Sequence, residues 1–238
     1  VFDVKIWPTT GDAAHPGGWG TILVAGMRFG GGTGGTGISV DVGADGVTTN
    51  DQITKSAYVI LDITNPEVAP TLLAELSPNN MNFTTSLPQV VAVGDASGAT
   101  AGKWFLVFGS GPNNPTTGAY SGVLMPAIYI YDLASVRTAT SAPTPTRQMN
   151  LSTNNVFIGD PGSADYDIDM KDEVFYVGTV GAPVPPGTSA ATLATLTRGS
   201  LYRVLVNEDA DPANWTGPTA VLSDLNQPFS SQPSVTVD

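Results

Sequence analysis

Short runs of β-branched and aromatic residues recur along the chain, and each is typical of a buried or half-buried strand. The runs are Val1–Trp7, Thr21–Phe29, Ala57–Ile63, Thr71–Leu76, Pro88–Val93, Lys103–Phe108, Ala127–Leu133, Glu173–Val177, Gly199–Val206, Thr219–Leu225 and Pro233–Val237. The segments between them are rich in Gly, Pro, Asn and Asp, which favour turns. This pattern predicts an all-β fold.

The predicted strands repeat with a period of about 70 residues. Similar tetrapeptides occur at Leu23–Gly26, Leu106–Gly109 and Phe175–Gly178. After a long loop, each is followed by one of a second group at Tyr58–Leu61, Ile128–Tyr131 and Leu201–Val204. Several strands per unit with recurring Gly and aromatic residues are typical of β-propeller blades. A Greek-key sandwich remains an alternative, because short strands alone do not separate the two.

The repeat divides one predicted propeller domain, residues 1–238, into about three four-stranded blades and the start of another. The units are roughly 1–80, 81–152 and 153–228, followed by a short stretch, 229–238. Propellers usually close with four to eight blades. We therefore expect the chain to be part of a larger polypeptide, with the strand at Pro233–Val237 paired either to Val1–Trp7 or to another polypeptide.

Three long insertions, each expected to join the same pair of successive strands in its unit, occur at Gly30–Lys55, Gly109–Pro126 and Gly178–Arg198. Equivalent connections in every blade of a propeller emerge on the same side. We therefore expect the three insertions to lie on one face. Since long loops commonly carry binding residues, that face is a candidate contact surface.

Charge and composition exclude several classes of protein. The net charge is −12 with only 9 Lys and Arg, which argues against nucleic acid and anionic membranes as partners. The chain contains no cysteine, so it has neither disulfides nor a thiol nucleophile. No apolar run is long enough to span a membrane.

One stretch, Ala164–Gly178, contains several closely spaced acidic residues. It reads ADYDIDMKDEVFYVG, so carboxylates alternate with other residues immediately before a predicted strand. Crowded carboxylates repel one another unless a cation lies between them. Calcium loops supply oxygen ligands at positions 1, 3, 5, 7 (a backbone carbonyl) and 9. Counted from the first aspartate, these positions are Asp165, Asp167, Asp169, the Lys171 carbonyl and Glu173.

The loop differs from an EF-hand, which has Gly at position 6 and Glu at position 12. Here these positions hold Met170 and Tyr176, and no amphipathic helix flanks the loop. The pattern therefore predicts a calcium-binding turn that leads into a strand. A solvated acidic turn is the alternative, because Asp is common in turns.

Five stretches together resemble the PilC/PilY family, the tip-associated adhesins of bacterial type IV pili. They are HPGGWGTILVAGMRFGGG, AYVILDITNPEVAPTLLAEL, GKWFLVFGSGPNN, DYDIDMKDEVFYVGTV and RGSLYRVLV. The resemblance is to the C-terminal β-propeller and implies a calcium loop that governs pilus extension and retraction alongside adhesion. It implies the same five ligands, with Glu173 where the family usually has Asp. Asp172 is an alternative at that ninth position.

The resemblance implies an extracellular protein at the pilus tip. Its partners would be minor pilins or other pilus subunits, a host or abiotic surface, and the remainder of a larger polypeptide. A purely structural filament component is one alternative. A hydrolase or quinoprotein-like enzyme is another, but we expect no enzyme, because the one histidine, His15, lies in a turn without an evident nucleophile. We expect His15 to be a surface or turn residue.

Overall fold

The computed structural model describes residues 1–33, 37–94, 102–112, 126–153, 156–181, 199–225 and 227–235. Its strands are β1 (Phe2–Lys5), β2 (Trp19–Gly26), β3 (Ile38–Val40), β4 (Gln52–Thr54), β5 (Tyr58–Asp62), β6 (Thr71–Leu76), β7 (Gln89–Val93), β8 (Lys103–Gly109), β9 (Ala127–Asp132), β10 (Arg147–Asn150), β11 (Val156–Ile158), β12 (Gly162–Ala164), β13 (Val174–Gly181), β14 (Gly199–Leu205) and β15 (Thr216–Leu225). The described helices are short: α1 (Leu133–Thr138) and the 3-10 turns Pro16–Gly18 and Pro212–Asn214. The prediction of an all-β fold is confirmed.

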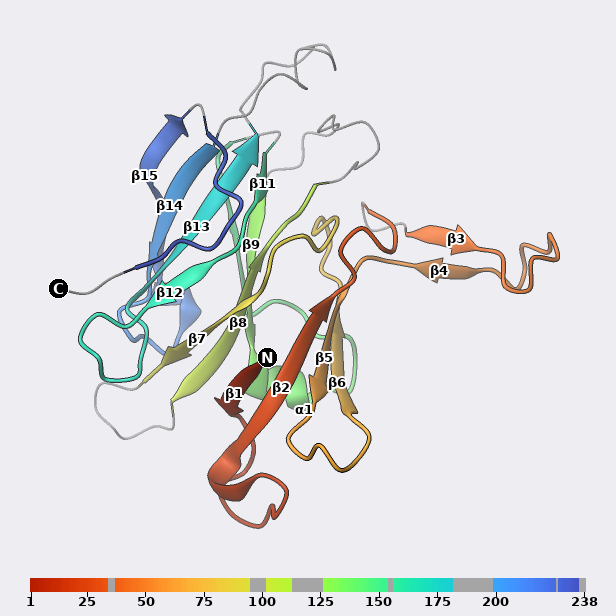
Figure 1. Cartoon of the computed structure of the whole chain (residues 1–238), viewed down its shortest axis with the longest axis horizontal. Helices are drawn as coiled ribbons and strands as arrows, with labels where there is room; N and C mark the ends of the chain where they lie inside the picture. Colours follow the sequence, from red (N-terminus) through yellow and green to blue (C-terminus); the bar gives the residue numbers. More distant parts are fainter. Residues whose placement is uncertain are drawn as a thin grey trace.

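Apart from the β3–β4 hairpin, the described strands form three antiparallel sheets, each built from one stretch of the chain (Figure 1). The first sheet has the order β1-β2-β5-β6, the second β7-β8-β9-β10 and the third β11-β13-β14-β15, with β12 also paired to β13. The repeated tetrapeptides occupy equivalent places, because the first group lies on β2, β8 and β13 and the second on β5, β9 and β14. Each sheet therefore comes from one stretch of the chain and places the repeated segments on its central strands.

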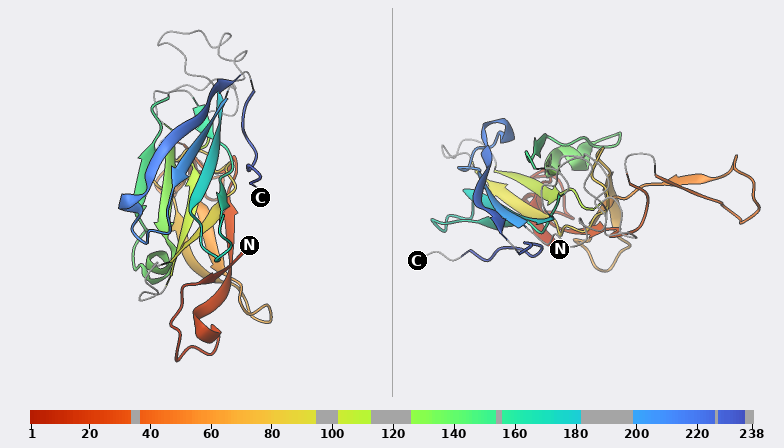
Figure 2. Two further views of the ribbon diagram at one scale, coloured as in Figure 1. Left: turned by 90° about the vertical axis from the view of Figure 1, so that its left-hand side faces the viewer. Right: turned by 90° about the horizontal axis from the view of Figure 1, so that it is seen from above.

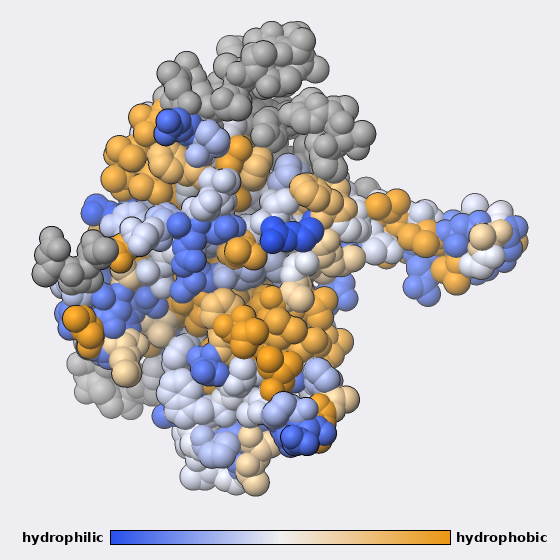
Figure 3. Space-filling view, viewed as in Figure 1, coloured by the Kyte–Doolittle hydropathy of each residue, from blue (hydrophilic) through white to orange (hydrophobic). Residues whose placement is uncertain are grey.

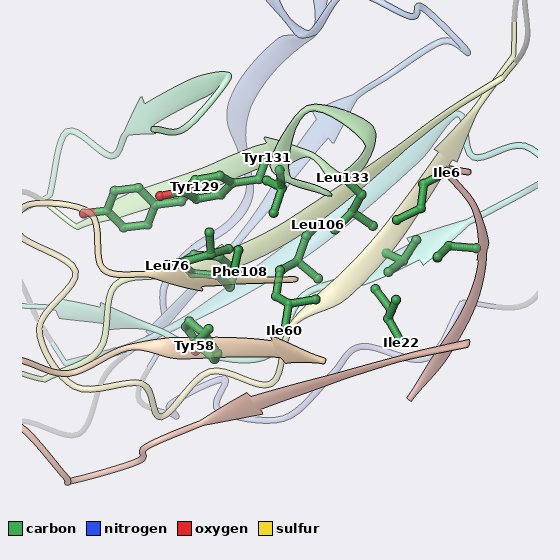
Figure 4. Packing of buried hydrophobic residues seen from close by; sticks show 14 of the residues in the cluster. Ile6, Ile22, Tyr58, Ile60, Leu76, Leu106, Phe108, Tyr129, Tyr131 and Leu133 are labelled. Atoms are coloured by element: carbon green, nitrogen blue, oxygen red, sulfur yellow. The ribbon is translucent and has the colours of Figure 1, made fainter. Parts of the chain in front are cut away.

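The second sheet lies between the other two and buries both of its faces. Along β8, Leu106 and Phe108 point into one hydrophobic core, which the first sheet completes (Figure 4). Phe105 and Val107 point into the other core, which is shared with the third sheet. Since side chains alternate across a strand, this fully apolar run covers both faces of the layer.

None of these sheets closes on itself, so a closed propeller is not established. The first and third sheets, at the two ends of the stack, leave one face each without a further sheet among the described residues. Apolar side chains gather on the surface over β2 and near β15 (Figure 3). The described residues form a series of open antiparallel sheets.

Several elements differ from the sequence prediction. The first insertion was predicted to be a loop but contains the β3–β4 hairpin, which projects away from the sheets (Figure 2). The strand predicted to run to Leu133 ends at Asp132, because the Asp132 carboxylate accepts hydrogen bonds from Ala134 N and Ser135 N and caps α1. The short strands β10, β11 and β12 were not predicted.

The strand predicted at Pro233–Val237 is absent from its described part, residues 233–235. The tail instead crosses the third sheet, where Phe229 N donates to Thr179 O over 3.0 Å. Gly178 makes room for this path, since a Cβ there would lie 2.3 Å from the Phe229 Cβ. Pro233 has no N–H to donate to a strand ladder, which is a physical reason against pairing there.

The long insertions follow β2, β8 and β13, each of which is the second strand in the order of its sheet. These three strands point in the same general direction in Figure 1. The bodies of two insertions, 113–125 and 182–198, lie outside the described residues, so the common loop face stays a prediction. Within the described residues, no helix is both long and apolar enough to cross a membrane.

Candidate metal centre

The acidic loop connects β12 to β13, two antiparallel neighbours in the third sheet. Its base is closed by a hydrogen bond from Glu173 N to Ala164 O, 3.2 Å long. Within the loop, one carboxylate oxygen from each of four residues lies within 4.8 Å of the others: Asp165, Asp167, Asp169 and Glu173. The fold therefore brings together all four carboxylates that the sequence predicted as ligands.

Asp165 organises the loop through both oxygens of its carboxylate. Oδ1 accepts hydrogen bonds from Ile168 N at 2.6 Å and Asp169 N at 3.1 Å, and Oδ2 accepts from Met170 N at 2.7 Å. This is the local side-chain-to-backbone bonding that favours Asp in turns. It wraps the chain around the carboxylate and turns the later acidic residues back toward it.

Glu173 contributes a buried carboxylate at the end of the loop, and its residue is only 7% exposed. Its Oε2 accepts from Tyr166 N at 2.7 Å, whereas the buried Oε1 has no hydrogen-bond partner among the described residues. Burial raises the pKa of this carboxyl, and the charges of Asp167 and Asp165 raise it further. A buried carboxylate oxygen without a partner is costly, and a cation would satisfy it.

Lys171 supplies the positive charge nearest to the loop. Its Nζ donates to Asp169 Oδ2 over 2.5 Å and to Glu208 Oε2 over 3.0 Å. The hydrogen bond to Asp169, followed by that to Glu208, raises the pKa of the Lys171 ammonium. The ammonium thus offsets part of the negative charge of the loop. The predicted role of this residue concerns its backbone carbonyl, and that role stays a prediction.

Asp172, the alternative ligand, makes a different contact. Its Oδ2 accepts from Ala92 N at 2.8 Å, and its own N–H donates to Ala92 O at 2.7 Å. Both bonds attach the loop to β7 of the second sheet. Burial raises the pKa of the Asp172 carboxyl. The structure therefore places Glu173 with the aspartates and uses Asp172 to join two sheets.

His15 lies at a turn, directly before Pro16–Gly18, but it is buried and not on the surface, since it is only 7% exposed. Its Nδ1 lies 2.8 Å from Asp12 Oδ2 and its Nε2 lies 3.0 Å from Asp62 Oδ2. Trp7 stacks on the ring with centroids 4.0 Å apart. Asp12 belongs to the same turn as His15, whereas Asp62 lies 47 residues further along the chain, so no local pattern predicts that this histidine is buried.

No protein-family model and no curated protein matches the chain. Among solved structures, it is similar to the crystal structure of the Pseudomonas aeruginosa PilY1 C-terminal domain, with a TM-score of 0.56 over 92% of this chain and 16% sequence identity. The chain resembles PilY1 in fold. It spans 39% of the length of that PilY1 chain. The resemblance to the C-terminal region of PilC/PilY proteins, predicted from five sequence stretches, is thus confirmed as a similarity of structure.

Proposed function

We propose that this chain is a calcium-binding β-propeller portion of an extracellular adhesin that acts in type IV pilus tip function or biogenesis. Calcium would order the 165–173 loop and thereby regulate surface contact or pilus dynamics. The structural similarity to the PilY1 C-terminal domain supports the association with pili. Binding, not catalysis, is the activity we propose.

The observation that carries the proposal is the buried Glu173 Oε1, which lacks a partner among the described residues beside three aspartates. Ordinary acidic turns are solvated and do not bury a carboxylate against other carboxylates. Burial, and after it the charges of Asp167 and Asp165, raise the pKa of Glu173. A divalent cation would supply the missing partner and favour the ionised carboxylate against both effects. The residues present therefore fit a metal.

The donor set favours calcium over the common alternatives. All the candidate side-chain ligands are carboxylates, which suit a hard cation, whereas zinc in proteins is bound mainly by Cys and His. Mg²⁺ requires near-ideal octahedral geometry at about 2.1 Å and releases water reluctantly. Ca²⁺ accepts six to eight oxygens at about 2.3–2.6 Å, so it tolerates a loop that is built from unequal side chains.

The partners in this proposal are minor pilins or other pilus subunits, a host or abiotic surface, and the remainder of a longer polypeptide. The net charge of −12 is consistent with a protein that does not bind nucleic acid. Bound calcium would fix the loop against β7 and β13, because Asp172 and Glu173 already contact the second and third sheets. The ion would in this way act on the junction between two blades.

Titration calorimetry and thermal denaturation test the metal. We expect Ca²⁺ to bind with a dissociation constant of roughly 10⁻⁶ to 10⁻³ M and Mg²⁺ to bind more weakly. At a hundredfold excess of Ca²⁺ over that constant, binding to the folded state adds about 2.7 kcal/mol to the free energy of unfolding. Chelation should therefore lower the melting temperature.

Glu173→Gln tests the role of this carboxylate most directly, because it keeps the shape of the side chain and removes the charge. It should weaken calcium binding, and Asp165→Ala should abolish it together with the sensitivity to chelator. Glu67→Ala, which removes an exposed carboxylate from a distant turn, is the matched control and should bind calcium normally. Wild-type protein that releases no heat with millimolar Ca²⁺ and melts identically in chelator would contradict the proposal.

A further inference from the structure

Lys171 is bonded to both carboxylate oxygens of one candidate ligand, Asp169. Its backbone N–H donates to Asp169 Oδ1 over 3.0 Å, and its ammonium donates to Oδ2 over 2.5 Å. Asp169 also supplies one of the four carboxylate oxygens that lie within 4.8 Å of one another. Whichever of its oxygens binds a metal ion, this carboxylate is already paired with a positive charge. The ammonium and a cation in the acidic cluster therefore compete for Asp169.

The side chain of Lys171 reaches Asp169 along a path that another sheet leaves open. It passes over Gly94, which follows β7, since a Cβ on Gly94 would lie 2.1 Å from Lys171 Cδ and 2.3 Å from Cε. Only glycine leaves this space. The Lys171 and Asp169 side chains are 30% and 35% exposed, so solvent screens their attraction only in part. Packing as well as charge thus holds the ammonium beside the acidic cluster.

A second carboxylate, outside the acidic cluster, also accepts from the ammonium. Glu208 Oε2 lies 3.0 Å from Lys171 Nζ. Because Val174 pairs with Leu205, the residues after β14 lie at the same end of the third sheet as the acidic loop (Figure 1). Glu208 has a left-handed backbone conformation, with φ of 55°, which is unfavourable for a residue other than glycine. The turn after β14 therefore adopts a strained conformation that presents Glu208 to Lys171.

The charges of the cluster decide which cation Asp169 prefers. The four clustered carboxylates carry one negative charge each when they are ionised: Asp165, Asp167, Asp169 and Glu173. The ammonium offsets one of these charges, whereas Ca²⁺ offsets two and also provides a partner for Glu173 Oε1. An ammonium that stayed on Asp169 beside bound Ca²⁺ would be repelled by the ion. Movement of the ammonium to Glu208 removes this repulsion and leaves both side chains paired.

We propose that Lys171 is an internal competitor of the metal ion: its ammonium binds Asp169 until Ca²⁺ arrives, and Glu208 then receives it. Lys171 lowers the affinity of the site for calcium, and Glu208 limits that effect by holding the displaced ammonium. Because Glu208 follows β14, binding of the ion also strengthens the contact between the acidic loop and the turn after β14. This inference rests on the calcium binding proposed above.

Titration calorimetry of the whole chain with Ca²⁺ tests the role of the ammonium. Lys171→Met keeps an unbranched side chain over Gly94 and removes its charge. It should bind Ca²⁺ about tenfold more tightly than wild type at low ionic strength, because a unit charge a few ångströms from a divalent ion is worth about that factor even at the dielectric constant of water. Lys5→Met, which removes an exposed positive charge from β1, is the matched control and should leave calcium affinity unchanged.

Glu208→Gln tests the second part of the proposal. In the wild-type background it should weaken calcium binding several-fold, because the ammonium then stays on Asp169. In the Lys171→Met background the same change should have little effect, since no ammonium has to move. An equal loss of affinity in both backgrounds would overturn the proposal, because Glu208 would then act only as a nearby negative charge.

Nitrogen NMR of the lysine ammonium groups in the wild-type protein gives a readout that does not depend on any variant's affinity. Ca²⁺ should shift the Lys171 resonance, assigned by its loss in Lys171→Met, and should leave that of Lys5 in place. If wild type binds calcium but Lys171→Met binds it no more tightly, or if Ca²⁺ does not move the Lys171 resonance, this inference is wrong and the proposed function stands. Absence of calcium binding in both wild type and Lys171→Met would overturn both.

Discussion

Residues 168 and 170 show how the acidic loop is closed without glycine. Ile168 and Met170 both adopt left-handed backbone conformations, with φ of 64° and 72°. For residues other than glycine, this conformation costs about 1–2 kcal/mol. Met170 stands at position 6 of the loop, where EF-hands have Gly, and its side chain is 88% exposed. It therefore contributes backbone strain and almost no packing.

Met170→Gly should raise the free energy of unfolding by about 0.5–1 kcal/mol, because relief of the strain exceeds the added entropy of the unfolded chain. Calcium should bind several-fold more tightly for the same reason. Urea denaturation and calorimetry measure the two effects. Met170→Ala is the control, since it shortens the side chain but keeps the strained conformation. If glycine is no more stabilising than alanine, the loop is not strained at this position.

At the scale of elements, the acidic loop joins two sheets. Glu173 directly precedes β13. Its backbone carbonyl accepts hydrogen bonds from Val206 N and Asn207 N, which follow β14. The preceding residue, Asp172, bonds Ala92 on β7. The loop thus connects the acidic cluster to the second sheet through two adjacent residues, Asp172 and Glu173, that make different contacts. A metal that orders the loop would also hold β7 against the third sheet.

Asp172→Ala should destabilise the protein by about 1–3 kcal/mol, because it leaves the Ala92 N–H without its acceptor. Asp172→Asn is the matched variant, since an amide oxygen can still accept from Ala92 while the buried charge is removed. Burial raises the pKa of this carboxyl, so Asn should be close to neutral for stability. Calcium affinity should be nearly unchanged in Asp172→Asn. A large loss of affinity there would make Asp172 a ligand.

At the scale of the whole molecule, the second sheet holds the other two together. Phe108 lies in the core with the first sheet, 4.4 Å between ring centroids from Tyr58. Phe105, on the other face, packs edge-on against Trp215 at 5.1 Å. Both phenylalanines are fully buried. Since one strand contributes to both cores, we expect the three sheets to unfold together. Disruption of either core should therefore destabilise all of them.

Phe108→Ala and Phe105→Ala should each lower the free energy of unfolding by about 3–5 kcal/mol. Both should shift one common transition, seen alike by tryptophan fluorescence and circular dichroism. Ile53→Ala, at a side chain 57% exposed on the hairpin, should change stability by less than about 0.5 kcal/mol. Two separate transitions in Phe108→Ala would show that the first sheet folds independently.

The sequence by itself determined the elements whose signal is local. Alternation and β-branched residues placed the strands that form the centre of each sheet, because a strand buried on both faces is apolar throughout. The spacing of Asp165, Asp167, Asp169 and Glu173 identified the acidic cluster, since residues this near in sequence can meet only in a turn. These features depend on neighbours along the chain.

Tertiary structure decided the features whose partners are distant. His15 is buried because Asp62, far along the chain, and Trp7 contact it. Asp172 lies apart from the acidic cluster because it is hydrogen-bonded to Ala92 of another sheet. A hollow lies beside β6 because the segment Ala139–Pro143, which follows α1, returns next to that strand. The periodicity of a sequence reports only on residues that are neighbours along the chain. Contacts between distant segments form only when the chain folds, so the sequence pattern does not predict them.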